Sequence, residues 1–181
     1  MAVLMSVPGF ASDLTVYDDF SYGDGAVNGS LWSTSIPSST TLEVSSNTVR
    51  IFSSVGGFPT TKSISMTSTS TVSNGFFVRG SQSNDSVSHA TNIVVYIGAT
   101  QVASLSCEDG SSVVDPWFVM GFKRDNGNWV IGYGRPTVLV AGSFTHDTNT
   151  VATDGTLKIE FNVNDGTGTS DTCYVDDVYM W

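Results

Sequence analysis

Two pairs of adjacent aspartates are the residues of this sequence best suited to hold a cation. Asp18 and Asp19 occur near the amino end in YDDF, and Asp176 and Asp177 occur near the carboxyl end in YVDDV. Side chains alternate between the faces of a strand, so one carboxylate of each pair must face inward unless a β-bulge intervenes. A buried carboxylate requires a basic partner, several N–H donors or a cation.

Calcium is one expectation for these four aspartates, and hydrogen bonding is the other. Calcium takes about six to eight oxygen ligands from carboxylates, carbonyls and water. Two acid-bearing segments side by side could supply these ligands, which predicts a structural Ca²⁺ site at Asp18, Asp19, Asp176 and Asp177. In the alternative, backbone N–H groups at turns or strand ends satisfy the carboxylates without a metal. The residues alone leave both alternatives open.

The sequence lacks the residue constellations of an enzyme. A glycosidase needs two suitably separated carboxyl groups. The glutamates occur in three unrelated segments, at Glu43, Glu108 and Glu160. Asn162 shares a predicted strand face with Glu160, but an amide cannot exchange a proton as a carboxyl group does. His89 and His146 are expected on the surface, without a nucleophile elbow or a second metal ligand nearby. We therefore expect no enzymatic activity.

Composition excludes several classes of partner. The 17 acidic and 7 basic residues give a net charge of -10, which disfavours nucleic-acid binding because phosphates require clustered Lys and Arg. There is no run of 18 apolar residues, so we expect no membrane span. Cys107 and Cys173 are too few for a disulfide framework, and they are either two buried thiols or a single disulfide.

Alternating polar and apolar residues predict an all-β fold, and no apolar stripe of helical period competes with this prediction. About ten short, closely spaced strands imply a two-sheet antiparallel β-sandwich. The predicted strands are Thr41–Val44, Thr48–Ser53, Lys62–Met66, Gly75–Arg79, Asn92–Ile97, Gln101–Ser106, Trp117–Lys123, Trp129–Tyr133, Thr137–Val140, Leu157–Val163 and Thr172–Trp181. The segment SMTSTSTV is predicted to be either solvent-facing alternation or an edge strand.

The clearest hairpin is WFVMGFKRDNGNWVIGYG, in which Asn126-Gly127 suits a two-residue turn. Pairing Asp125 with Asn128 predicts one core-facing side of the ribbon, made of Met120, Phe122, Arg124, Trp129, Ile131 and Tyr133. The opposite side then holds Val119, Gly121, Lys123, Val130, Gly132 and Gly134. Glycines within strands mark either tight packing or the close approach of a ligand.

The two chain ends resemble those of a known fold. An opening DDF, a Gly/Asp-rich loop and Leu-Trp, with a closing VDDV, resemble the concanavalin A-like, LamG-type jelly roll of lectins, glucanases and many virion proteins. The matching residues are Asp18, Asp19, Phe20, Trp32, Val175, Asp176, Asp177 and Val178. The resemblance covers the chain in outline and implies that the terminal strands, with their acid pairs, are neighbours in one sheet. The glucanases of this fold carry Glu-x-Asp-x-Glu on one strand, and this chain does not.

The chain is expected to divide into an apolar arm, residues 1–12, and one β-sandwich domain, residues 13–181. The arm lacks the positive charge of a secretory signal, so we expect it to be retained. Its apolar residues need a surface to bury against, either on a neighbouring subunit or on the same sandwich. These features, with the resemblance, favour a non-enzymatic structural or assembly protein that self-associates or contacts other subunits of a virion surface, decoration, fibre or extracellular filament.

A lectin-like, carbohydrate-binding module is the alternative function. Exposed aromatic rings that stack on sugar faces would be its signature. The candidates for such rings, as ligand-binding residues for surface glycans, are Trp117, Trp129, Tyr22 and Tyr96. Aromatic residues of β-sandwiches also form the core, so burial of these side chains decides between the two interpretations.

Overall fold

The computed structural model describes residues 15–38, 40–53, 60–83, 91–107, 115–124, 126–134, 145–150, 153–165 and 172–181. Thirteen strands lie in these ranges: β1 (Thr15–Asp18), β2 (Trp32–Ser35), β3 (Thr40–Ser45), β4 (Thr48–Ser53), β5 (Thr60–Val72), β6 (Gly75–Ser83), β7 (Thr91–Ile97), β8 (Thr100–Cys107), β9 (Asp115–Lys123), β10 (Trp129–Gly134), β11 (Thr145–Thr150), β12 (Gly155–Asp165) and β13 (Thr172–Met180). Within the same ranges, no helix is long and apolar enough to cross a membrane.

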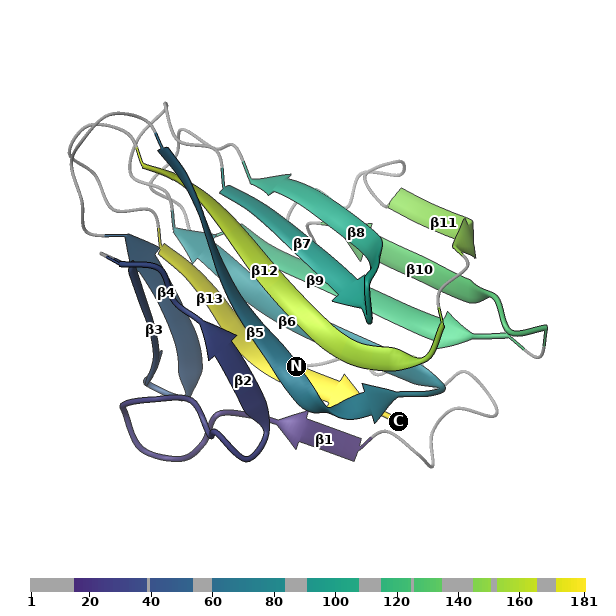
Figure 1. Ribbon diagram of the computed structural model, residues 1–181, viewed down its shortest axis with the longest axis horizontal. Coiled ribbons are helices and arrows are strands. Elements are labelled where there is room, and N and C mark those ends of the chain that lie inside the picture. The colour runs from purple at the N-terminus through teal and green to yellow at the C-terminus, as the bar shows by residue number, and fades with distance from the viewer. Residues whose placement is uncertain are drawn as a thin grey trace.

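The strands form two antiparallel sheets that pack face to face (Figure 1). The large sheet has the order β11-β10-β9-β6-β13-β4-β3, and β1 also pairs with β13. The small sheet has the order β2-β5-β12-β7-β8 and lies in front of the large sheet in Figure 1. This arrangement confirms the predicted all-β, two-sheet sandwich.

The core lies between the sheets and follows the alternation of the sequence. The inward side chains of the large sheet include Val78, Trp117, Val119, Trp129 and Ile131, each at most 1% exposed. Those of the small sheet include Ile64, Met66, Ile93, Ile159 and Phe161, all 0% exposed. Burying one such side chain contributes about 1.5–3 kcal/mol, so this apolar layer is the main source of stability.

Most strand positions follow from the sequence, and β4 has the predicted bounds. Three strands were not predicted, β1, β2 and β11, and the predicted strand Thr137–Val140 lies outside the described residues. The segment SMTSTSTV is part of β5, which pairs with both β2 and β12 and is therefore interior. The outward Ser and Thr side chains of β5 are typical of an edge strand. Both backbone edges of β5 are nevertheless hydrogen-bonded to neighbouring strands.

The predicted hairpin exists, but its register is wrong by one residue. Trp129 pairs with Lys123, and Arg124 N donates to Asn128 O at 2.8 Å, whereas the predicted register pairs Trp129 with Arg124. A one-residue shift moves every side chain of one strand to the other face. The core face of β9 therefore holds Val119 and Gly121, whereas Met120 is 37% exposed.

The glycines of this hairpin also separate onto two faces. A Cβ atom added to Gly121 would lie 2.5 Å from the Phe76 ring, so this residue is a site of tight core packing. Gly132 and Gly134 pair with Met120 and Phe118 on the outer face of the large sheet. The glycine strip predicted from the sequence thus does not form one groove.

The loop position of Gly127 generates a stability prediction. Its φ of 82° lies in the left-handed region, which β-branched residues resist. We expect Gly127→Val to lower the free energy of unfolding by at least about 1 kcal/mol, measured by chemical denaturation. Gly127→Asn is the matched control, because Asn tolerates this conformation, and should cost clearly less. Equal stability of the Val variant and the parent would contradict the turn.

Candidate functional site

The first and last strands lie side by side, as the resemblance implied. β1 pairs antiparallel with β13, with Thr15 opposite Met180 and Asp18 opposite Val178. The prediction that the two acid-bearing segments are neighbours is therefore confirmed. The pairing brings four aspartates to one part of the large sheet, where their individual orientations decide what they can bind.

Asp18 is the inward carboxylate of the first pair and is only 4% exposed. Its Oδ1 accepts a hydrogen bond from Phe20 N at 2.8 Å, and its Oδ2 accepts from Trp32 Nε1 at 2.8 Å and from Tyr22 OH at 3.1 Å. These protein donors offset much of the cost of removing a carboxylate from water. The network joins β1 to the loop between β1 and β2, through Phe20 and Tyr22, and to Trp32 of β2. It therefore connects the two sheets at the first strands of the sandwich.

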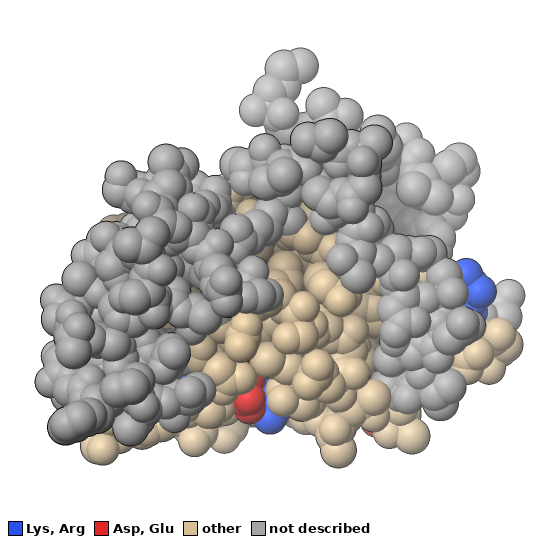
Figure 2. Space-filling model, turned by 90° about the horizontal axis from the view of Figure 1, so that it is seen from above, with Lys and Arg blue, Asp and Glu red and all other residues tan. Residues whose placement is uncertain are grey.

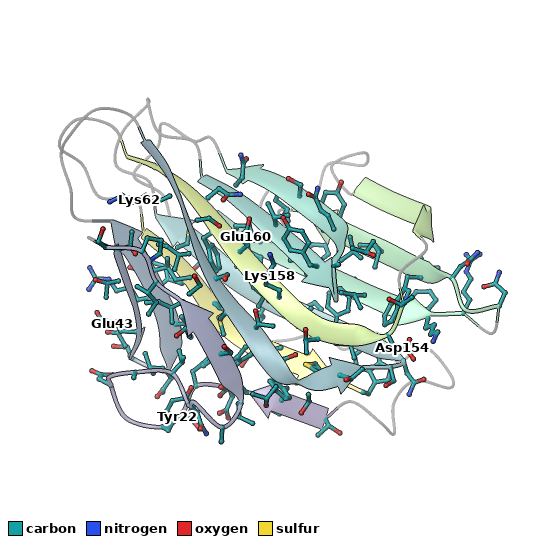
Figure 3. The ribbon with its side chains drawn as sticks, in the orientation of Figure 1. Tyr22, Glu43, Lys62, Asp154, Lys158 and Glu160 are labelled. Atoms are coloured by element: carbon teal, nitrogen blue, oxygen red, sulfur yellow. The ribbon has the colours of Figure 1, made fainter. Side chains whose placement is uncertain are left out.

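Tyr22 belongs to this network, and its half-buried ring packs against the core. Its hydroxyl donates to Asp18 and accepts from Asn28 N at 2.9 Å. Burial, followed by the negative charge of Asp18, raises the pKa of Tyr22 to about 12, so the phenol stays protonated and keeps donating. Tyr22 lies at the foot of the molecule in Figure 3. Its contacts indicate a structural role.

The other three aspartates are partly or fully exposed. Asp19 is exposed and accepts from Ser21 N at 3.1 Å and Ser21 Oγ at 2.7 Å, which lowers its pKa. The pairing of β13 with β6 shifts between Val175 and Asp177, and this bulge leaves Asp176 and Asp177 both partly exposed. Asp177 forms an ion pair with Arg79. Burial raises the pKa of Asp176, and the nearby Arg79 charge partly opposes this rise.

The four carboxylates do not form one set of calcium ligands. Asp18 faces the core and is saturated by protein donors, whereas Asp177 faces outward against Arg79. Among the residues that the structure describes, no group of three or more His, Cys, Asp or Glu side chains could hold a metal ion. Hydrogen bonds and an ion pair account for Asp18, Asp19 and Asp177, and calcium binding stays a prediction of the sequence.

The Asp18 network predicts a large difference between the two adjacent aspartates. Asp18→Ala leaves the Trp32 and Tyr22 donors buried without their acceptor, so we expect the free energy of unfolding to fall by about 3 kcal/mol. Asp19→Ala removes only exposed hydrogen bonds and should cost less than about 1 kcal/mol. Denaturant unfolding of both variants measures the difference, and similar losses would show that the buried network is not a major source of stability.

Calcium has its own test. A cation bound only by the folded state raises stability as RT ln(1 + [L]/Kd), about 2.7 kcal/mol at a hundredfold excess over Kd. The hydrogen bonds of Asp18 and the ion pair of Asp177 lead us to expect equal melting temperatures in calcium and in chelator. A melting temperature that rises with free calcium, and no longer does so in Asp18→Asn with Asp177→Asn, would show instead that these carboxylates bind the ion.

The four aromatic residues predicted to bind a ligand fall into three environments. Trp117 and Trp129 are 1% and 0% exposed, so neither ring is open to a ligand. Tyr22 serves the Asp18 network. Tyr96 alone of the four lies on an outer sheet face, because its neighbours Val95 and Ile97 point into the core.

Tyr96 is part of a charged cluster on the outer face of the small sheet. Lys158 on β12 pairs with Tyr96 on β7, and its Nζ lies 3.8 Å from the centroid of the Tyr96 ring. The same ammonium group lies 2.9 Å from Glu160 Oε2, and the Tyr96 hydroxyl lies 3.5 Å from Glu160 Oε1. Figure 3 shows Lys158 and Glu160 next to each other on β12. We refer to these three residues as the Tyr96 cluster.

Hydroxyl and amide side chains surround the Tyr96 cluster. Glu160 lies between Ser65 of β5 and Val94 of β7, and the next outward pair on the same strands brings Asn162 beside Asn92 and Ser63. Burial alone would raise the pKa of Glu160. The Lys158 charge and hydrogen bonds from Lys158, Ser63 and Asn162 outweigh this effect, so the pKa of Glu160 is lowered. The face thus combines one ionised carboxylate, one ammonium group and several neutral polar groups.

Comparison with known proteins identifies the fold and nothing finer. No family model and no curated protein matches the sequence. The Bacillus licheniformis beta-glucanase resembles it in structure with a TM-score of 0.54 and 10% identity, over 94% of this chain and 98% of the glucanase. The Emp47p carbohydrate recognition domain resembles it with a TM-score of 0.55 and 8% identity, over 94% and 97% of the two chains. The fold is the concanavalin A-like jelly roll. A sialidase matches 92% of this jelly roll at a TM-score of 0.59 and 9% identity, but the chain spans only 18% of the sialidase.

The sequence contained a partial signal for the Tyr96 cluster. Alternation in LKIEFNVND predicts that Glu160 and Asn162 share one strand face, and this prediction is confirmed. Lys158 was missed as a site residue. Its pairing with Tyr96 joins strands about 60 residues apart in the chain, and no local pattern encodes that pairing.

Proposed function

We propose that this jelly roll is a non-enzymatic, lectin-like module that binds glycans on the outer face of the small sheet. The observation that carries the proposal is the Tyr96 cluster, which holds an aromatic ring, a carboxylate and an ammonium group in contact on a partly exposed face. The similarity in fold to a carbohydrate recognition domain supports the same function.

The groups of this face match the chemistry of a neutral sugar. Each sugar hydroxyl both donates and accepts hydrogen bonds, so the Glu160 carboxylate suits its donor and the Lys158 ammonium suits its lone pairs. Lys158 already covers one face of the Tyr96 ring, and the ring thereby fixes the ammonium group in position. Asn92 and Asn162 extend the hydrogen-bonding surface along the strands. Recognition would therefore depend more on hydrogen bonds than on ring stacking.

The same face argues against hydrolysis. Glycosidases act through two carboxyl groups on opposite sides of the scissile bond. On the outward positions of the small-sheet strands, in the part of the chain that the structure describes, Glu160 is the one carboxylate. It is ionised and paired with Lys158, so it also lacks the raised pKa that a general acid needs. Binding without turnover is the function that these groups support.

Glycan arrays followed by calorimetry test the proposal. We expect Tyr96→Ala and Glu160→Gln to weaken binding of the best oligosaccharide at least about tenfold, which is about 1.4 kcal/mol each. Glu43→Gln is the matched control, because Glu43 on β3 also lies near a cation, Arg50, but belongs to the large sheet. No binding on the array would refute the proposal, as would equal affinities of all three variants, and release of reducing ends would refute its non-enzymatic part.

The pH dependence of binding provides a second readout. Because the pKa of Glu160 is lowered from 4.5, its carboxylate stays ionised at and above that pH. We therefore expect constant affinity from about pH 5 to about pH 8, with loss only on further acidification. The Glu160→Gln variant should lack that acid-side loss.

A role in virion or filament assembly, on a virion surface or outside the cell, stays a second proposal. It rests on the apolar arm, on the lack of a secretory signal and of a catalytic constellation in the sequence, and on the resemblance of the chain ends to jelly rolls of virion proteins. Residues 1–14 lie outside the part that the structure describes. The jelly-roll fold is compatible with either role.

A further inference from the structure

The outer face of the large sheet carries a row of apolar side chains. Val16 pairs with Tyr179, Tyr179 with Phe77, and Phe77 with Met120, so one row crosses β1, β13, β6 and β9. Directly paired residues of antiparallel strands share a face. Phe76 and Val78, which alternate with Phe77, are both 0% exposed in the core, so the row points away from the small sheet.

Phe118 extends this row, because its ring stacks on Phe77 with the centroids 6.5 Å apart. We refer to Val16, Phe77, Phe118, Met120 and Tyr179 as the outer apolar patch. Val16 and Met120 are 49% and 37% exposed, two of the most exposed large apolar side chains among the described residues. Soluble proteins rarely leave such a continuous patch in water unless it binds something.

Charge restricts the kind of partner. The chain has a net charge of -10, which opposes contact with anionic lipid and also opposes packing two whole sheets of two copies against each other. The charged residues closest to the row in the pairing scheme are Arg79 and Asp177, which neutralise one another. Figure 2 views the molecule from above and not onto this row, and few charged side chains are visible among the described residues on that side. A suitable partner is therefore apolar and nearly neutral.

The first 14 residues of the chain have this composition. They include Val3, Leu4, Met5, Val7, Phe10 and Leu14, and their only charged side chain is Asp13. Extended, about 14 residues span roughly 46 Å, whereas a row across four strands spans about 15 Å. The segment is therefore long enough to cover the patch with residues to spare.

The position of β1 favours binding of the patch by residues 1–14 of another copy over residues 1–14 of the same chain. Thr15 pairs with Met180, the last residue of β13, so a chain continued in the direction of β1 would pass the end of β13 and leave the sheet. Val16 and Met120 also remain exposed in the single chain. We propose that residues 1–14 of a second copy bind the outer apolar patch, so that two chains associate by exchanging arms. This inference is independent of glycan binding, which uses the other sheet.

Sedimentation velocity on full-length proteins tests arm exchange. The parent should self-associate, and Met120→Lys on the patch and Leu4→Lys with Val7→Lys in the arm should each weaken association at least about tenfold. Ile36→Lys is the matched control, since Ile36 is 45% exposed but follows β2 of the small sheet, and it should associate like the parent. Val16→Lys, at a position 49% exposed, replaces Met120→Lys if that variant fails to fold.

Mixing the two defective proteins distinguishes arm exchange from other contacts. The arm variant keeps its patch and the Met120→Lys variant keeps its arm, so together they should form a one-to-one heterodimer that neither forms alone. A monomeric parent at all concentrations would overturn the proposal. Association of the arm variant at parental strength would overturn it in favour of direct contact between sheets, as would a mixture that stays monomeric. Equal weakening by Ile36→Lys, or binding of the parent to neutral vesicles in place of self-association, would also overturn it.

Discussion

Each sheet of this sandwich has one face packed against the other sheet, and no strand among the described residues packs on its other face, so the outer side chains are the ones placed to contact a partner. The covered faces are apolar in both sheets and form the core. The remaining faces differ in chemistry. The small sheet presents Lys158, Glu160 and Tyr96 among Ser, Thr and Asn side chains, whereas the large sheet presents a row of apolar and aromatic side chains. This difference in chemistry is the reason for proposing a hydrated ligand on the small sheet and an apolar segment on the large sheet.

The buried carboxylate of Asp18 connects this two-layer architecture to the amino-terminal loop. β1 has only four residues and, among the described strands, pairs only with β13, so few backbone hydrogen bonds hold it. Asp18 adds side-chain hydrogen bonds to Trp32 of β2, which belongs to the other sheet. A buried carboxylate thus connects the first strand of the large sheet to the first strand of the small sheet. The apolar row begins at Val16 on this same strand, so the network also fixes one border of the patch.

The similarity to glucanases and to a carbohydrate recognition domain has a simple physical basis. A fold is set by the pattern of buried residues and strand pairings, and many sequences satisfy it, which is why identities near 10% accompany coverage of 94% of the chain. Function depends on a few side chains on an outer face. On that face of the small sheet, among the described residues, this chain has one carboxylate paired with a lysine, an arrangement suited to hydrogen bonding.

Local patterns in the sequence were sufficient for most of the strands and for the two-sheet sandwich, because alternation and turn residues act over a few residues, and the resemblance of the chain ends to the jelly roll implied that the terminal strands are neighbours. They failed where a single residue changes the register. Trp129 pairs with Lys123 in place of Arg124, which reverses the faces of Met120 and Val119, and a bulge at β13 leaves Asp176 and Asp177 both partly exposed. Only the tertiary structure placed Lys158 against Tyr96 and Val16 in line with Met120, because those contacts join strands that are far apart in the chain. Their alignment depends on hydrogen-bond register across whole sheets, which no short segment of sequence specifies.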